Sequence, residues 1–180
     1  MRALVVFESM FGNTEVIARA IAEGLAADAT VEVVEVGSAP PTIPPGVDLL
    51  VVGGPTHAHG LSKPETRADS ARRAGDRQIS RGTGIREWLE TLRSSSLTVA
   101  IAVFDTRIKG PGLVWGSAAK GAARNVRDLG FHIVVGPESF LVEGPTGPLF
   151  DRLVAGETDR ARRWGESLVA GLRDQVTARR

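Results

Sequence analysis

The stretch "ESMFGNTEVIARAI", residues 8–21, joins two segments whose apolar residues follow different periods. The segment before it, residues 2–7, is continuously apolar after its first residue, which predicts a buried β-strand. Residues 13–27, which begin within this stretch and end after it, carry apolar side chains at helical spacing, which predicts an amphipathic helix. The turn between strand and helix is short, polar and contains Gly12. A strand, a polar turn and a helix in this order indicate the first unit of an α/β fold.

The rest of the chain repeats this alternation. Further strands are expected at 30–36, 48–53, 97–104 and 131–135, the last resumed at 139–142, and further helices at 83–94, 116–129 and 157–175. Strands that alternate with helices imply right-handed crossovers and a parallel sheet with both faces covered. The sequence therefore predicts one domain over residues 1–180, a three-layer doubly wound five-stranded parallel sheet. A long basic loop is inserted at about 61–82.

Composition narrows the functional classes. The chain of 180 residues has no cysteine, which excludes disulfides, iron–sulfur clusters, thiolate zinc sites and thiol nucleophiles. It has three histidines, too few and too scattered to predict a metal site. No apolar run reaches the length of a membrane span. Glu8 interrupts the apolar start before it could form a signal-peptide core, so we expect a cytoplasmic protein.

Positive charge is concentrated in two segments, although the whole chain has a net charge of only +1. Residues 61–82 carry six Lys or Arg and three acids, and residues 160–180 carry six Arg and two acids. A long insertion in a compact domain is usually functional or disordered. The insertion is therefore a candidate lid over a substrate, a candidate docking surface for an acidic redox partner, or a solvated loop. It has no aromatic residue to stack bases, so we expect no nucleic-acid binding.

The turn after the first strand has the chemistry of an anion site. A helix N-terminus offers unpaired N–H groups and partial positive charge, and Gly12 lets the backbone approach a ligand closely. Ser9, Asn13 and Thr14 add short polar side chains. The loop contains no lysine, which argues against a nucleotide triphosphatase loop. Taken alone, these residues fit either a phosphate site or an ordinary helix cap.

Three loops together resemble the flavodoxin family. "SMFGNTEVIARAIAEGL" (9–25) resembles its phosphate loop, Ser/Thr-x-x-Gly-Asn-Thr after the first strand. "GGPTHAHG" (53–60) and "FDTRIKGPG" (104–112) fall where flavodoxin-like proteins contact the flavin ring, and "GSAAKGAARNVRDLGFHIV" (116–134) is similar to the family's penultimate helix and last strand. The resemblance implies a flavodoxin-like fold with strand order 2-1-3-4-5 and FMN as the cofactor.

The resemblance also assigns residues to parts of FMN, and it assigns no catalytic residue. The phosphate would be held by Ser9, Met10, Gly12, Asn13 and Thr14. The ribityl chain and the dimethylbenzene side of the ring would be bordered by Pro55, Thr56, His57, Ala58 and Gly60. The pyrimidine side would be bordered by Phe104, Asp105, Thr106, Arg107 and Gly110.

Two departures from the family pattern concern the ring. Many flavodoxins place a Trp and a Tyr on either side of it, and this chain has no Tyr. Trp88 and Trp164 fit helix positions and are expected in the core, which leaves Trp115, His57 and His59 as candidates beside the ring. The second departure is the positive charge of the loop expected near the pyrimidine.

Arg107 and Lys109 fall on the loop expected near the pyrimidine. Positive charge favours an anionic reduced ring. If these side chains face the ring, its potential should lie above that of an acidic flavodoxin.

The favoured function is an FMN-binding redox protein that transfers electrons to or from a partner protein, either a reductase or an acceptor. An alternative is an FMN-dependent oxidoreductase of the NAD(P)H:quinone type, or a flavodoxin-like oxidase, acting on a small quinone-like acceptor. A cofactor-free interaction module on the same fold is a further alternative. A receiver-type signalling domain is disfavoured, because it needs an acidic pair after the first strand and an Asp after the third, where this chain has Glu8 alone and Gly53-Gly54.

Overall fold

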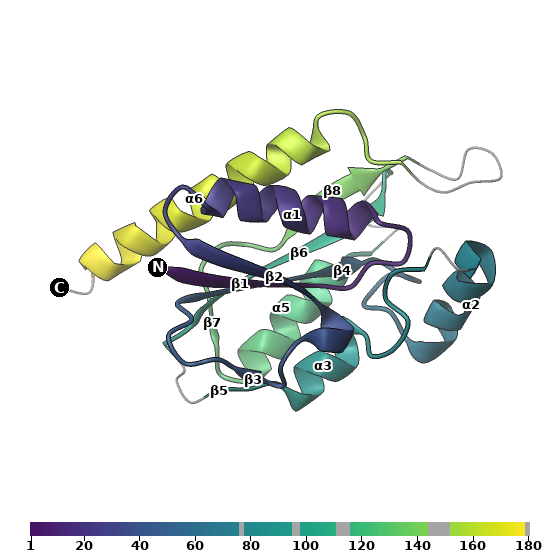
Figure 1. The fold of residues 1–180 in the computed structure, drawn as a ribbon, viewed down its shortest axis with the longest axis horizontal. Helices are drawn as coiled ribbons and strands as arrows, with labels where there is room; N and C mark the ends of the chain where they lie inside the picture. Colours follow the sequence, from purple (N-terminus) through teal and green to yellow (C-terminus); the bar gives the residue numbers. More distant parts are fainter. Residues whose placement is uncertain (76–77, 95–97, 111–115, 144–151, 179–180) are drawn as a thin grey trace.

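A parallel β-sheet forms the centre of the computed structural model, which describes residues 1–75, 78–94, 98–110, 116–143 and 152–178 (Figure 1). The strands are β1 (Arg2–Phe7), β2 (Thr30–Glu35), β3 (Thr42–Ile43), β4 (Leu49–Pro55), β5 (Arg93–Ser94), β6 (Ala100–Ile108), β7 (His132–Ile133) and β8 (Glu138–Val142). The helices are α1 (Asn13–Leu25), α2 (Pro64–Ala74), α3 (Ile85–Thr91), α5 (Ala118–Asp128) and α6 (Glu157–Ala178), with a 3-10 turn at Val36–Ser38.

The sheet has the order β2-β1-β4-β6-β7, and β8 also pairs with β6. This confirms the predicted order 2-1-3-4-5, because β4, β6 and β7 are its third, fourth and fifth strands. The last strand is split, with β7 beside the start of β6 and β8 beside its end. Phe7 of β1 lies opposite Gly53 of β4, which lies opposite Phe104 of β6. β1 ends in this row, whereas β4 and β6 continue to Pro55 and Ile108, so all three strands end at the same edge of the sheet.

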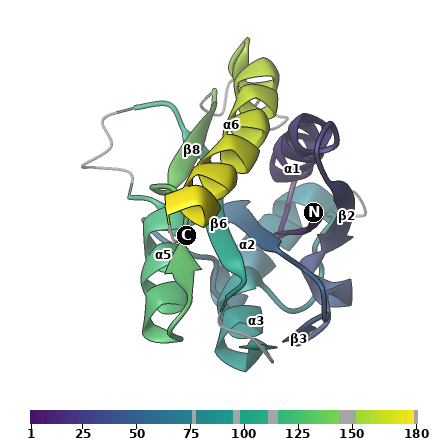
Figure 2. The same cartoon turned by 90° about the vertical axis from the view of Figure 1, so that its left-hand side faces the viewer.

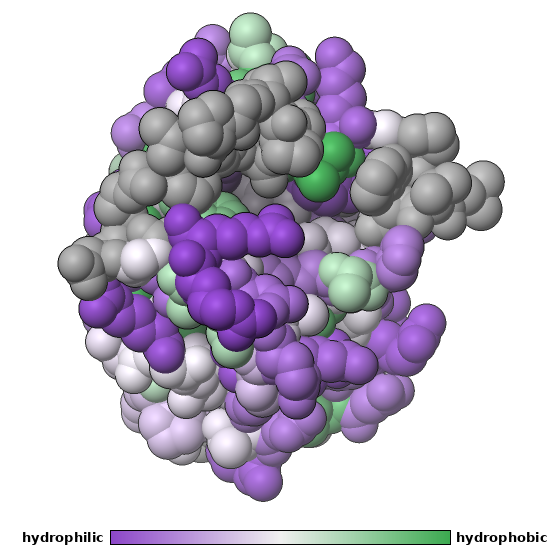
Figure 3. All heavy atoms as spheres, turned by 90° about the vertical axis from the view of Figure 1, so that its right-hand side faces the viewer, coloured by the Kyte–Doolittle hydropathy of each residue, from purple (hydrophilic) through white to green (hydrophobic). Residues whose placement is uncertain are grey.

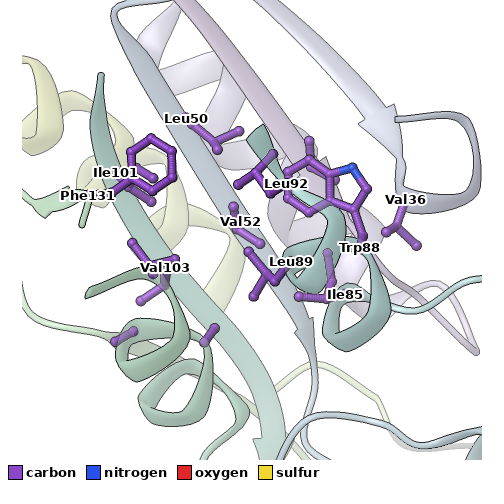
Figure 4. Close-up of a cluster of buried hydrophobic side chains, with 14 of the residues drawn as sticks. Val36, Leu50, Val52, Ile85, Trp88, Leu89, Leu92, Ile101, Val103 and Phe131 are labelled. Carbon is purple, nitrogen blue, oxygen red and sulfur yellow. The ribbon is translucent and has the colours of Figure 1, made fainter. Parts of the chain in front are cut away.

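Helices cover both faces of the sheet, as Figures 1 and 2 show: α1 and α6 lie on one face, and α3 and α5 on the other. On the α3 and α5 face, Trp88 packs among aliphatic side chains of the strands and α3 (Figure 4). On the α1 and α6 face, Trp164 packs edge-to-face on Phe104 and Phe140, with ring centroids 6.4 and 6.1 Å away. Trp88 is 3% exposed and Trp164 is 8% exposed, which confirms both as core residues.

Two glycines let α1 and α6 touch backbone to backbone. A Cβ added to Gly24 would lie 2.0 Å from the carbonyl oxygen of Arg162, and one added to Gly165 would lie 2.3 Å from that of Ile21. Any side chain at these two positions would force the helices apart, because backbone atoms cannot move aside as the end of a side chain can.

The inserted segment contains a helix, α2, where the sequence predicts only a loop. Pro64 occupies a first-turn position that suits proline, and the Thr66 hydroxyl accepts a hydrogen bond from the Lys63 N–H and donates one to the Lys63 carbonyl. Arg72 and Arg73 in the last turn complement the helix dipole. The prediction failed because α2 has no apolar stripe at helical spacing. Hydrogen bonds and charges at the two ends of the helix, together with contacts with the rest of the fold, stabilise it instead.

Candidate functional site

A pocket lies where the loops after β1 and β4 meet the end of β6. Figure 3 looks onto this end of the sheet, where hydrophilic side chains predominate. The pocket is lined by Ser9, Met10, Phe11, Asn13 and Thr14 after β1, by Pro55, Thr56 and His57 at and after the end of β4, and by Thr106, Arg107 and Ile108 of β6 with Val142 of β8. The structure thus brings together residues from all three segments that the sequence singles out. Among the residues that the structure describes, no acidic side chain belongs to this lining.

The loop after β1 is shaped by Ser9 from within. The Ser9 hydroxyl is buried and accepts the N–H groups of Gly12, at 3.1 Å, and Glu15, at 3.4 Å. Gly12 has a φ of 97°, a left-handed conformation that favours glycine. Thr14 lies 2.7 Å, hydroxyl to hydroxyl, from Thr106 of β6. The side chains of Ser9 and Thr14 therefore fix the loop in place, and Asn13 is the more exposed polar side chain at the start of α1.

Residues 79–80, at the end of the insertion, form hydrogen bonds with the loop after β1. The N–H of Ser80 donates to the Ser9 carbonyl at 2.8 Å, and the N–H of Ser9 donates to the Ser80 hydroxyl at 2.9 Å. The N–H of Ile79 donates to the Met10 carbonyl at 3.3 Å. The Ser80 hydroxyl in turn donates to the Glu35 carboxylate at 2.6 Å. Sequence reasoning missed these contacts, because they join segments about seventy residues apart and leave no periodic signal.

The connection after β4 makes a tight turn beside the pocket. His57 and Gly60 exchange backbone hydrogen bonds of 2.9 and 3.0 Å, and the two central residues, Ala58 and His59, have φ values of 44° and 76°. Positive φ at both central positions is typical of a type I′ turn. The left-handed conformation costs Ala58 roughly 1–2 kcal/mol, because its side chain has no polar group to form a compensating local hydrogen bond. Gly116 packs directly against the turn, so closely that a Cβ there would lie 2.2 Å from the His59 carbonyl oxygen.

Asp105 joins three elements below the pocket. Its carboxylate is fully buried, and Oδ2 accepts hydrogen bonds from the Thr56 hydroxyl at 3.1 Å, the Ser117 hydroxyl at 2.6 Å and the Ala119 N–H at 2.9 Å. Asp105 therefore links β6 to the β4 loop and to the start of α5. Phe104, its neighbour, points the other way and is 1% exposed in the core.

Six of the predicted contact residues lie outside the pocket lining: Gly12, Ala58, Gly60, Phe104, Asp105 and Gly110. Conversely, Phe11, Ile108 and Val142 line the pocket and were not predicted. Val142 belongs to β8, which extends past β7 along β6, so only the split of the last strand brings it here. Trp115 lies outside the described residues.

Arg107 is the cation in the pocket. It lies on β6, which continues to Ile108, and it is half-buried. Its Nη1 is buried and has no hydrogen-bond partner among the described residues. A buried donor without an acceptor costs free energy, so such atoms are uncommon, and a bound ligand is one source of the missing acceptor. Lys109, two residues on, is exposed.

A buried polar cluster fastens α2 beside the pocket. Glu8, at the end of β1, accepts hydrogen bonds from the Ser62 hydroxyl at 2.5 Å and the Ile85 N–H at 2.9 Å. Arg67 of α2 donates to the Ser62 hydroxyl at 3.0 Å and pairs with Glu87 at 3.1 Å. Burial raises the pKa of Glu8, against the opposing effects of these hydrogen bonds and of Arg67.

His57 lines the pocket in its neutral form near pH 7. Burial and the nearby charge of Arg67 lower the pKa of His57, and a hydrogen bond with the Thr66 backbone opposes this shift. Arg107 is therefore the positive charge of the lining. The pocket has a volume of about 80 Å³. Sites for whole small molecules usually span roughly 300–1,000 Å³, so a ligand of FMN's size would extend beyond this pocket.

Comparison with known proteins identifies the family. The protein-family model described as Flavodoxin matches residues 5–134. The chain belongs to the flavodoxin family. No curated protein matches its sequence. Membership indicates a flavodoxin-like, flavin-binding redox protein.

Solved structures show the same fold at low identity. A flavodoxin from the domain Archaea is 16% identical, with a TM-score of 0.61 over 96% of this chain and 99% of its own. The flavodoxin of Streptococcus pneumoniae TIGR4 is 18% identical, with a TM-score of 0.60 over 94% and 99%. The Flv1 flavodiiron core of Synechocystis is 16% identical, with a TM-score of 0.62 over 97% of this chain. This chain covers 36% of that core.

Across the described ranges, no helix is long and apolar enough to cross a membrane. Within the same ranges, no three acidic, histidine or cysteine side chains gather as a metal site requires.

Proposed function

We propose that this flavodoxin-family protein binds FMN in the pocket at the carboxyl ends of β1, β4 and β6 and transfers electrons through it. The observation that carries the proposal is the buried Nη1 of Arg107, which has no partner among the described residues, in a pocket whose described lining contains no acid. An anionic ligand would supply the missing acceptor. Flavodoxin family membership makes a flavin the ligand to expect.

The phosphate of FMN fits the loop that begins α1. The first N–H groups of a helix lack intrahelical acceptors and carry partial positive charge. Asn13 adds an amide there, and Ser9 and Thr14 hold the loop open through their contacts with backbone and Thr106. The predicted phosphate residues thus divide between those that present donors and those that shape the loop.

On the ring side, FMN supplies one- and two-electron redox chemistry when it is bound. Arg107 and the neutral His57 are among the polar groups of the described lining there, together with Thr56 and Thr106. A positive charge near a ring that gains electrons stabilises the added negative charge. We therefore expect the reduced state to be reached at a higher potential than in a flavodoxin whose ring is surrounded by acids.

Titration of the purified protein with FMN and with riboflavin tests the proposal. If the α1 loop holds the phosphate, FMN should bind at least about tenfold more tightly than riboflavin, because a charged hydrogen bond contributes about 1.5–3 kcal/mol. Equal affinities would contradict the assignment of the loop. A protein that binds neither compound would favour a cofactor-free interaction module.

The electron-transfer role is tested by following oxidation of the reduced, FMN-loaded protein. We expect reduction to require a separate reductase protein, with electrons then passing to an acceptor protein. Sustained NAD(P)H oxidation with a quinone and without a reductase would contradict this and support the quinone-reductase alternative.

A further inference from the structure

A second pocket lies on the other side of the turn at residues 57–60. It is formed between that turn, α3 and α5, and has a volume of about 390 Å³. His57 lines the first pocket, whereas His59 and Gly60 line the second, so the turn separates the two. Its backbone hydrogen bonds and its contact with Gly116 make it a fixed wall.

Three cations line this second pocket: Arg86 of α3, and Lys120 and Arg124 of α5. Within the described part of the chain, no acidic residue belongs to this lining. Arg86 is held in place because its Nη2 donates to the Leu61 carbonyl at 2.8 Å and its Nε to the Ser62 carbonyl at 3.1 Å. The side chains of Ser117 and Asn125 add neutral polar groups.

Lys120 and Arg124 are exposed, and neither forms an ion pair with any described residue. They are four residues apart on one helix, an arrangement that places like charges side by side and destabilises the helix. At the same spacing on α1, Arg19 pairs with Glu15. The pocket thus concentrates positive charge that the protein itself does not neutralise.

We propose that this pocket binds a phosphate-bearing small molecule, a diphosphate or a nucleotide. Its volume falls within the range of small-molecule sites, roughly 300–1,000 Å³. Arginine side chains bind phosphate oxygens in a two-pronged geometry, and lysine adds a point charge. A small molecule is favoured over an acidic protein surface because the three cations line a hollow. This inference goes beyond FMN binding, since it concerns a separate pocket.

Isothermal titration of the purified full-length chain with inorganic pyrophosphate and with ADP tests the proposal. It is run on the protein loaded with FMN and freed of excess FMN, or on the chain as purified if FMN does not bind. We expect saturable binding that weakens as salt rises, because exposed charges are screened over about 8–10 Å at ordinary salt concentrations. Because the titration can be run whether or not FMN binds, failure to bind FMN and failure to bind pyrophosphate or ADP remain distinguishable.

Arg124→Gln should weaken ADP and pyrophosphate binding at least about tenfold, the loss expected for one charged hydrogen bond. The matched control is Arg127→Gln, an exposed arginine of the same helix outside the lining, which should change affinity less than about threefold. Thermal melts of both variants check folding. Three results overturn the proposal: no saturable binding at low salt, equal losses in the two variants, or tighter binding of a polyglutamate peptide than of ADP.

Discussion

Replacement of Arg107 with methionine should change stability and cofactor affinity in opposite directions. In the protein without FMN, the change removes a buried donor that has no partner among the described residues. An unsatisfied buried group costs about 1–3 kcal/mol. Because the Arg107 side chain is only half-buried, we expect a gain near the lower end, about 1 kcal/mol. For a chain of this length, that gain raises Tm by about 2–4 °C. Methionine retains an apolar stem to fill the space beneath the guanidinium.

In the presence of FMN, the same change removes a donor to the anionic ligand. A hydrogen bond to a charged group contributes about 1.5–3 kcal/mol, which corresponds to roughly a 10- to 150-fold rise in Kd. The assays are thermal melts of the protein without FMN and a fluorescence-quenching titration with FMN. Lys109→Gln is the matched control, because Lys109 is an exposed cation two residues away, and a surface change alters stability by less than about 0.5 kcal/mol.

Two results would refute the reasoning about Arg107. A methionine variant whose Kd for FMN stays within twofold of the native value would show that Arg107 does not face the ligand. An equal loss of affinity in Lys109→Gln would show that general positive charge, rather than the buried donor, attracts FMN.

Three further changes test the framework of the site. Gly165→Ala places a Cβ 2.3 Å from a carbonyl oxygen of α1, so denaturant unfolding should show a loss of about 1–3 kcal/mol. Gly171→Ala on the same helix meets nothing within 4 Å and should gain about 0.5–1 kcal/mol; equal effects at the two glycines would contradict the close helix contact. Burial raises the pKa of Glu8, so the folded state binds its proton more tightly than the unfolded chain does, and this contribution to stability is lost as pH rises from the ordinary pKa of a glutamate through the raised one. Across that range, urea melts should show the free energy of unfolding of Glu8→Gln rising relative to that of the native protein by up to about 1.4 kcal/mol per pH unit. Parallel pH profiles of the two proteins would exclude the effect. Ser80→Ala leaves the N–H of Ser9 without its acceptor, so we expect a loss of about 1–3 kcal/mol and weaker FMN binding; native values of both would show that this contact does not support the loop.

The sequence predicted the sheet well because its strands are buried on both faces. A strand such as residues 49–55 has to be continuously apolar, and that pattern is legible without knowledge of its neighbours. The order of the strands came from the family resemblance. The separate two-stranded sheet of β3 and β5 was not predicted, because strands of two residues carry no period.

The candidate site was predicted in outline but not in its division of roles. The polar residues after β1 and β4 were located because parallel strands end at one edge of the sheet. Those of the third segment were expected in a loop, but Asp105, Thr106 and Arg107 lie within β6, which continues to Ile108. Sequence could not show that Asp105 is a buried link between elements, since its partners Thr56 and Ser117 are distant along the chain. Nor could it show that Phe104 faces the core, because a strand buried on both faces does not reveal which side chain points which way.

The pairing of Ser80 with Ser9 means that α2 and its flanks are not a detachable module. The segment is anchored at both ends, by Ser62 to Glu8 and Arg67 to Glu87, and by Ser80 to Ser9 in the loop after β1. Deleting residues 61–82 would remove the hydrogen bonds by which Ser80 and Ile79 support the loop after β1, whose residues line the pocket. Because coupling between two binding events is reciprocal, a molecule that breaks the Ser80–Ser9 contact when it binds α2 would weaken the proposed binding of FMN, and FMN would weaken the binding of that molecule by the same factor.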